Sequence, residues 1–205
     1  MIDARLLPFI KRALDRPARA LVARGISADQ ITLAGFGIGL LGVVAAAAGL
    51  FGAALLCLAL NRLADGLDGA VARLTRPTDR GAFLDIALDF MFYGLFPLGF
   101  ALHDAPTNAL PAAVLIASFI GTGSSFLAFS IIAEKRGITS DAYPTKGIYY
   151  LGGLTEGTET IALFVAMCLF PALFPWLAYG FAALCAITTI TRWMAGWRLF
   201  SRDHT

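Results

Sequence analysis

Long apolar runs recur along this chain, and they constrain its fold more than any other feature. Each run approaches the ~20 apolar residues that a helix needs to cross the hydrocarbon core of a bilayer. In lipid a single segment must satisfy its own backbone hydrogen bonds, which favours helices. The sequence therefore predicts an all-α integral membrane protein with about six transmembrane helices. The predicted segments are residues 30–49, 51–72, 81–102, 109–132, 153–172 and 176–198.

The composition agrees with this interpretation. Of the 205 residues, 58% are hydrophobic and 15% are charged, and the mean hydropathy is +0.74. A soluble domain would carry about 25% charged residues. We therefore expect a single membrane domain over residues 1–205, made of an interfacial helix at 1–28 and a six-helix bundle at 29–200.

The first residues have the pattern of a helix that lies in the membrane interface. Ile2, Leu6, Ile10 and Leu14 recur at helical spacing, while basic residues occupy the other faces. A helix with one apolar and one basic face binds in the plane of the headgroups. The sequence therefore predicts an amphipathic helix before the first span.

The placement of basic residues predicts the orientation. The sixteen Lys and Arg residues fall into four groups. These groups lie at residues 5–24, 62–80, 135–146 and 192–202, and the alternate loops at 49–52, 103–108 and 171–175 carry none. By the positive-inside rule, both termini and all four groups face the cytoplasm of the inner membrane. The net charge of +2 then reflects topology, and no nucleic-acid partner is expected.

Four aspartates lie inside two of these apolar segments. Asp65 and Asp68 are i,i+3 neighbours, and Asp85 and Asp89 are i,i+4 neighbours, so each pair shares one helix face. Ionised groups at membrane depth are costly and indicate a functional site. Two facing pairs of hard oxygen ligands could hold divalent cations, which suits phosphoryl-transfer chemistry.

Small residues accompany these acids. Gly66, Gly69 and Ala72 flank the first pair, and Gly81 precedes the second. Small residues at such spacing allow helices to pack closely in membranes. They would equally allow a large ligand to lie against bare backbone, and both interpretations stay open.

The acids by themselves are compatible with three classes of protein. One is a phosphoryl-transfer enzyme, the second is an intramembrane prenyltransferase acting on a prenyl diphosphate, and the third is a divalent-cation transporter. The short chain argues against the prenyltransferase, which needs more spans and two well-separated aspartate motifs. The sequence shows no half-to-half symmetry of the kind found in many transporters.

The order of these residues resembles the signature of one family, the CDP-alcohol phosphotransferases. The pattern is D-x-x-D-G-x-x-A-R followed by G-x-x-x-D-x-x-x-D. Its positions here are Asp65, Asp68, Gly69, Ala72, Arg73, Gly81, Asp85 and Asp89. The resemblance covers essentially the whole chain. Two departures are a slightly short segment between Arg73 and Gly81, and Asp29 where the family often has asparagine.

The resemblance implies that the chain transfers a phosphatidyl group from CDP-diacylglycerol to an acceptor alcohol and releases CMP. It implies two Mg²⁺ or Mn²⁺ ions held by Asp65, Asp68, Asp85 and Asp89, with Asp89 also acting as the catalytic base. It further implies a homodimer surrounded by membrane lipid. The residues expected to contact the CDP group are Asp65, Gly69, Ala72, Arg73, Gly81 and Thr32.

The acceptor alcohol is left open by the sequence. Lys135, Lys146 and Arg192 could bind a phosphorylated acceptor, or they could anchor helix ends to anionic lipid. Glu156 and Glu159 could line the acceptor pocket, or they could complement the dipole at a helix N-terminus.

Overall fold

The structure is a computed structural model, and it describes residues 14–138 and 154–201. These two ranges contain helices and no strand. Residues 14–23 are helical and precede the longer elements. The remaining elements are α2 (Ala28–Ala47), α3 (Phe51–Leu74), α4 (Asp79–His103), α5 (Ala105–Lys135), α6 (Gly157–Leu169), a 3₁₀ turn (Pro171–Leu173) and α7 (Phe174–Phe200).

All six expected apolar segments contain a helix, which confirms the all-α membrane fold. Within residues 14–138 and 154–201, four helical stretches are long and apolar enough to cross a membrane: α2, α4, α5 and the stretch Pro171–Phe200. Helix α3 has 24 residues, but Arg62, Asp65, Asp68 and Arg73 interrupt its apolar character.

Helix α6 is shorter than the expected span at 153–172. It has 13 residues, which at ~1.5 Å per residue reach about 20 Å, less than the ~30 Å hydrocarbon core. It ends before Phe170, whose backbone (φ −129°, ψ 61°) is not helical, because the following Pro171 disfavours the helical conformation there. Among the described residues, this segment is therefore a shorter apolar helix than the expected span.

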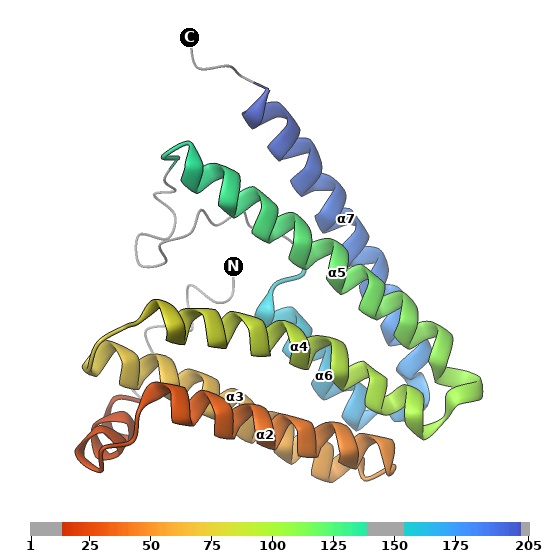
Figure 1. The fold of residues 1–205 in the computed structure, drawn as a ribbon. Coiled ribbons are helices and arrows are strands. Elements are labelled where there is room, and N and C mark those ends of the chain that lie inside the picture. Colours follow the sequence, from red (N-terminus) through yellow and green to blue (C-terminus); the bar gives the residue numbers. More distant parts are fainter. Residues whose placement is uncertain (1–13, 139–153, 202–205) are drawn as a thin grey trace.

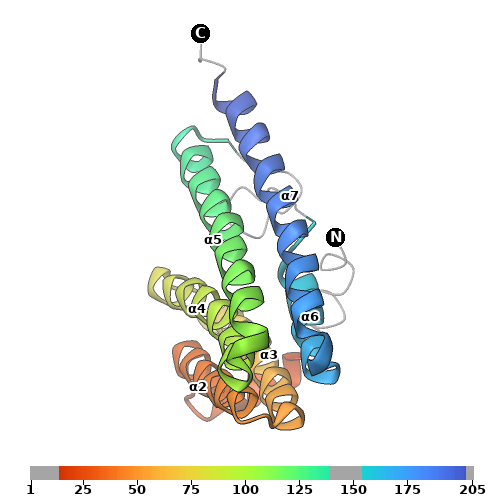
Figure 2. The same cartoon turned by 90° about the vertical axis from the view of Figure 1, so that its right-hand side faces the viewer.

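The helices form two groups that diverge from one end of the molecule. In Figure 1, α2, α3 and α4 lie side by side, and α2 contacts both of the others. Helix α5 turns away after the short connection at Asp104 and runs alongside α7, as Figure 2 shows from the side. Helix α6 contacts α3 and α7 and so links the two groups.

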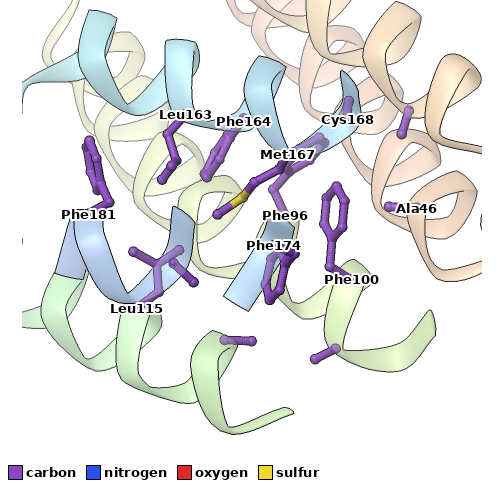
Figure 3. Packing of buried hydrophobic residues seen from close by; sticks show 14 of the residues in the cluster. Ala46, Phe96, Phe100, Leu115, Leu163, Phe164, Met167, Cys168, Phe174 and Phe181 are labelled. Carbon is purple, nitrogen blue, oxygen red and sulfur yellow. The ribbon is translucent and has the colours of Figure 1, made fainter. Parts of the chain in front are cut away.

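An aromatic core holds α4 against α6 and α7. Phe92, Phe96 and Phe100 recur every four residues on one face of α4, and each is buried. The ring centroids of Phe96 and Phe164 are 4.7 Å apart, and Phe100 stacks on Phe174 at 5.0 Å (Figure 3). Because Phe92 lies one turn beyond Asp89, this core also fixes the rotation of α4 that directs its acids.

A second, smaller core attaches the helical residues 14–23 to the bundle. Leu14 and Ala18 are buried against Ile31 of α2 and against Ala70 and Val71 of α3. The described part of the expected interfacial helix therefore packs on the ends of α2 and α3. Residues 1–13 lie outside the described residues.

Candidate functional site

Close packing of α2 on α3 brings the polar residues of the site together. A Cβ atom added to Gly35 would lie only 2.7 Å from the Cβ atom of Ala64, so the two backbones need a glycine here. Beside this contact, the buried amide of Asn61 donates a 2.9 Å hydrogen bond to the carbonyl oxygen of Gly35. This close contact positions Thr32 of α2 opposite the aspartates of α3.

The four expected aspartates line a single narrow pocket between α2, α3 and α4. We call it the acidic pocket; its volume is about 20 Å³, and it is lined by Asp65, Asp68, Asp85, Asp89, Arg62, Asn61 and Thr32, among others. Asp68 is 6% exposed and accepts a 2.6 Å hydrogen bond from the Thr32 hydroxyl. The other three are partly buried. All four carboxylates therefore line one pocket, with one pair on α3 and the other on α4.

Sequence reasoning missed Arg62, which also lies in the acidic pocket. Its Nη2 atom is 2.8 Å from Oδ1 of Asp89, and its Nη1 atom is 3.7 Å from Oδ2 of Asp65. The guanidinium thus bridges carboxylates of two facing helices. The signal was present, because Arg62 precedes Asp65 by three residues and shares its helix face.

The donor atoms of the acidic pocket suit a divalent cation. Carboxylate oxygens are hard ligands, the type that Mg²⁺ and Mn²⁺ prefer. In their present side-chain positions, no three His, Cys, Asp or Glu residues among the described ranges converge closely enough to hold an ion. The chemistry of the pocket therefore fits a metal, while Arg62 and Thr32 currently engage three of its carboxylates.

A second cavity, which we call the large cavity, adjoins the acidic pocket. Its volume is about 450 Å³, and Thr32, Asp68 and Asp85 line both spaces. Gly69, Ala72 and Gly81, three of the residues expected to contact CDP, lie in its wall. The two interpretations of the small residues therefore apply to different positions. Gly66 packs against Leu14, with 2.8 Å between an added Cβ and Cδ1. Gly69 and Gly81 line the large cavity, where an added Cβ would lie 3.2 Å from Arg73 Nη1 and from Asp29 Oδ1, respectively.

Two expected CDP contacts lie outside the wall of the large cavity. Asp65 lines the acidic pocket only. Arg73 is exposed, and its Nη1 atom would be 3.2 Å from a Cβ added to Gly69. Its side chain therefore lies along the rim of the large cavity.

The departure at Asp29 has a local explanation. Asp29 forms an ion pair with Arg80, with 2.5 Å between Oδ2 and Nη2. This ion pair joins the first turns of α2 and α4 beside the large cavity. Asp29 does not cap α2; the cap is Ser27, which forms a reciprocal capping box with Gln30. An aspartate at this position thus forms a charge pair that asparagine could not.

A third cavity contains two of the candidate acceptor residues. It has a volume of about 160 Å³ and is lined in part by Tyr93, Phe126, Thr122, Glu156 and Arg192; we call it the side cavity. Glu156 and Arg192 are each 7% exposed. The Nη1 atom of Arg192 donates to the carbonyl oxygen of Thr122 at 3.0 Å, and its guanidinium lies 5.6 Å from the Phe126 ring centroid.

Tyr93 separates the side cavity from the acidic pocket. It lines the side cavity, and the guanidinium of Arg62 lies 5.8 Å from its ring centroid. Tyr93 follows Asp89 by one helical turn, so the base candidate and the side cavity are near neighbours on α4.

The remaining candidates have other positions. Glu159 accepts a hydrogen bond from the backbone N–H of Glu156 at 3.1 Å, within the capping box of α6. Lys135 is exposed in the last turn of α5 and is not among the described residues that line the side cavity. Lys146 lies outside the described residues.

Comparison with known proteins supports one family. A family model described as CDP-alcohol phosphatidyltransferase matches residues 26–197. The inner membrane protein YnjF of Escherichia coli is 54% identical over 96% of this chain and 96% of its own length.

Two solved structures have the same fold. Both are phosphatidylinositol phosphate synthase (PgsA1) of Mycobacterium tuberculosis. The crystal structure with CDP-DAG bound has a TM-score of 0.73 and 22% identity, covering 91% of this chain and 94% of the other. The complex with manganese and citrate has a TM-score of 0.71 and 23% identity, covering 90% and 88%.

Proposed function

The chain belongs to the CDP-alcohol phosphatidyltransferase family, and on that premise we propose that it transfers a phosphatidyl group from CDP-diacylglycerol to an acceptor alcohol. It is an enzyme of this class and an integral membrane protein. The observation that carries the proposal is the junction between the large cavity and the acidic pocket at Thr32, Asp68 and Asp85. A nucleotide in the large cavity would extend its diphosphate across this junction.

The family membership favours this reaction over the two alternatives. A prenyltransferase would need room for a polyisoprenoid beside the acids, and a transporter would need a path for ions through the bundle. Neither alternative explains why Gly69 and Ala72 of α3 and Gly81 of α4 line the same cavity of about 450 Å³.

We propose that two Mg²⁺ or Mn²⁺ ions are held by Asp65, Asp68, Asp85 and Asp89. The support is the set of hard oxygen donors in one pocket. When bound, such ions neutralise negative charge on the diphosphate and on the leaving CMP. The manganese complex of PgsA1, a protein with the same fold, is compatible with this assignment.

The proposed chemistry assigns Asp89 as the general base. Its carboxylate accepts the proton of the acceptor hydroxyl, and the hydroxyl oxygen forms a bond to the β-phosphorus of the donor. The bond from that phosphorus to the bridging oxygen breaks, and CMP leaves with the oxygen. The support for this role is that Asp89 lines the acidic pocket and lies one turn from Tyr93, which lines the side cavity.

We place the acceptor in the side cavity, with Arg192 and Glu156 as its charged contacts. Both side chains come from elements that pack beside α4, and both line the cavity. Lys135, Lys146 and Glu159 stay weaker candidates. The termini and the site would face the cytoplasm, as the distribution of basic residues predicts, and the homodimer stays a prediction that light scattering in detergent can check.

The proposal is tested by CMP release from the purified full-length protein. With CDP-diacylglycerol, Mn²⁺ and a panel of alcohols, we expect CMP together with a new phospholipid for at least one acceptor. Asp89→Asn should bind the donor but lose at least about 10²-fold in turnover, the usual contribution of a positioned base. Mass spectrometry of the lipid product would identify the acceptor.

A matched control uses the aspartate at the other end of α4. Asp104 caps α5 and accepts a hydrogen bond from the backbone N–H of Thr107. Asparagine caps helices equally well, so Asp104→Asn should retain activity. Equal activity of the Asp89→Asn variant and the wild type would overturn the role of Asp89.

A further inference from the structure

Arg62 occupies the position between α3 and α4 where a cation is needed. The acidic pocket contains four carboxylates, and Arg62 is the basic residue in its lining. Its guanidinium reaches Asp89 on α4 at 2.8 Å and Asp65 on α3 at 3.7 Å. A bridge between carboxylates of two facing helices is the contact that a divalent ion would also make.

The Arg62 side chain is fixed from several sides. Its Nε and Nη2 atoms donate hydrogen bonds to Oδ1 of Asn61 at 2.8 Å and 2.7 Å. The amide of Asn61 in turn donates a hydrogen bond to the backbone carbonyl oxygen of Gly35 in α2. Its guanidinium also lies 5.3 Å from the ring centroid of Phe92 and 5.8 Å from that of Tyr93. With 18% of the side chain exposed, Arg62 is a built-in part of the pocket.

The free space of the acidic pocket leaves little room for other cations. A volume of about 20 Å³ holds little more than a water molecule or two. A cation that ligated both Asp65 and Asp89 would compete with Arg62 for the space between these carboxylates, where the guanidinium now contacts Oδ2 of Asp65 and Oδ1 of Asp89. The positive charges of the cation and of the Arg62 guanidinium would also repel each other strongly at such close range in a partly buried site.

We propose that Arg62 is an intrinsic counter-ion of the acidic pocket that competes with the divalent metal for Asp65 and Asp89. It keeps the two carboxylates together without metal, and metal binding displaces its guanidinium from them. The hydrogen bonds to Asn61 and the rings of Phe92 and Tyr93 then hold the displaced charge beside the site. This inference rests on the proposed function, because it concerns the same carboxylates.

Direct Mn²⁺ binding to the full-length protein tests the proposal. The dissociation constant is measured with Mn²⁺ alone, by the electron paramagnetic resonance signal of the free ion. We expect Arg62→Gln to bind Mn²⁺ at least tenfold more tightly than the wild type, and Arg62→Lys to lie between them. A lysine keeps the charge but cannot bridge Asp65, Asp89 and Asn61 with a planar fork.

The sign of the change separates competition from a merely structural role. If Arg62 only supported the pocket, its loss would loosen the carboxylates and weaken Mn²⁺ binding. Arg19→Gln is the control for losing one positive charge, since Arg19 is exposed and pairs with Asp15 outside the pocket; its Mn²⁺ affinity should equal that of the wild type. If Arg62→Gln does not fold, Mn²⁺ binding by the folded Arg62→Lys variant is used instead: tighter binding supports competition, and weaker binding supports a structural role.

Unchanged or weaker Mn²⁺ binding by the folded Arg62 variants would overturn the inference. CMP release by the wild type gives a separate measurement of the proposed function. An active wild type with unchanged Mn²⁺ affinity in the variants would reject the role of Arg62 alone. Tighter binding in the variants with no CMP release by the wild type would reject the proposed function alone.

Discussion

The roles of individual polar residues in this protein depend on which of the cavities they line. Thr32 and Asp68 are joined by a 2.6 Å hydrogen bond at the junction of two cavities, so they fix one side of that junction. Asp29 and Arg80 form an ion pair beside the large cavity. Gly69 lies in the wall of the large cavity, so a side chain added there would compete with Arg73 and with a ligand for the same space.

Replacement of Gly69 tests whether the large cavity holds the donor. Gly69→Leu would fill part of the cavity, so the KM for CDP-diacylglycerol should rise at least tenfold while the KM for the acceptor changes little. Initial-rate kinetics of CMP release measure both constants. Gly52→Leu is the matched control, because Gly52 lies on the same helix with no atom within 4 Å of an added Cβ. Equal donor KM values for the two variants would contradict the assignment.

The helices act as rigid supports whose contacts determine where the acids meet. Helix α2 packs on both α3 and α4, and α4 is held from its other side by the aromatic core. Small residues allow close contacts of this kind, with Gly35 against Ala64 and Gly39 against Phe92. The separation of α2 and α3 therefore controls the hydrogen bond between Thr32 and Asp68.

Overpacking at the contact between α2 and α3 should destabilise the fold. Gly35→Leu would force the two backbones apart and should lower the free energy of unfolding by about 1–3 kcal/mol, the usual cost of added core volume. Unfolding in mixed detergent micelles measures the change. Gly37→Leu, two residues away, meets no atom within 4 Å and should leave stability nearly unchanged. A stable Gly35→Leu variant would show that this contact is not tight.

At the scale of the whole molecule, the acidic pocket, the large cavity and the side cavity all lie around the N-terminal half of α4. The large cavity joins the acidic pocket through shared residues, and Tyr93 divides the acidic pocket from the side cavity. This sequence of spaces would place a nucleotide, a diphosphate and an acceptor in line. The distribution of basic residues predicts that this end faces the cytoplasm.

The two ends of α7 provide a test of that orientation. In a parent chain with Cys57, Cys168 and Cys185 replaced by alanine, one cysteine is introduced by Ala172→Cys or Ser201→Cys, at exposed positions flanking the helix. A membrane-impermeant maleimide added to intact bacterial cells should label the first variant and reach the second only after lysis. The reverse pattern would invert the predicted topology.

The sequence by itself determined the helices and the principal acids. Apolar runs located all six helical segments to within a few residues, and the i,i+3 and i,i+4 spacings placed each aspartate pair on one face, since both depend on interactions local to one helix. Contacts between helices could not be predicted in this way. Arg62 bridges Asp65 to Asp89, and Gly66 packs while Gly69 borders a cavity.

Only the tertiary structure decided these contacts, because they depend on how far each helix is rotated and how closely it approaches its neighbours. The capping box at Glu156 and the proline after Phe170 shortened α6, although its apolar composition favoured a longer span. The pairing of Asp29 with Arg80 likewise required α2 and α4 to begin side by side. Local periodicity gives each helix its faces, and packing between helices determines which faces meet.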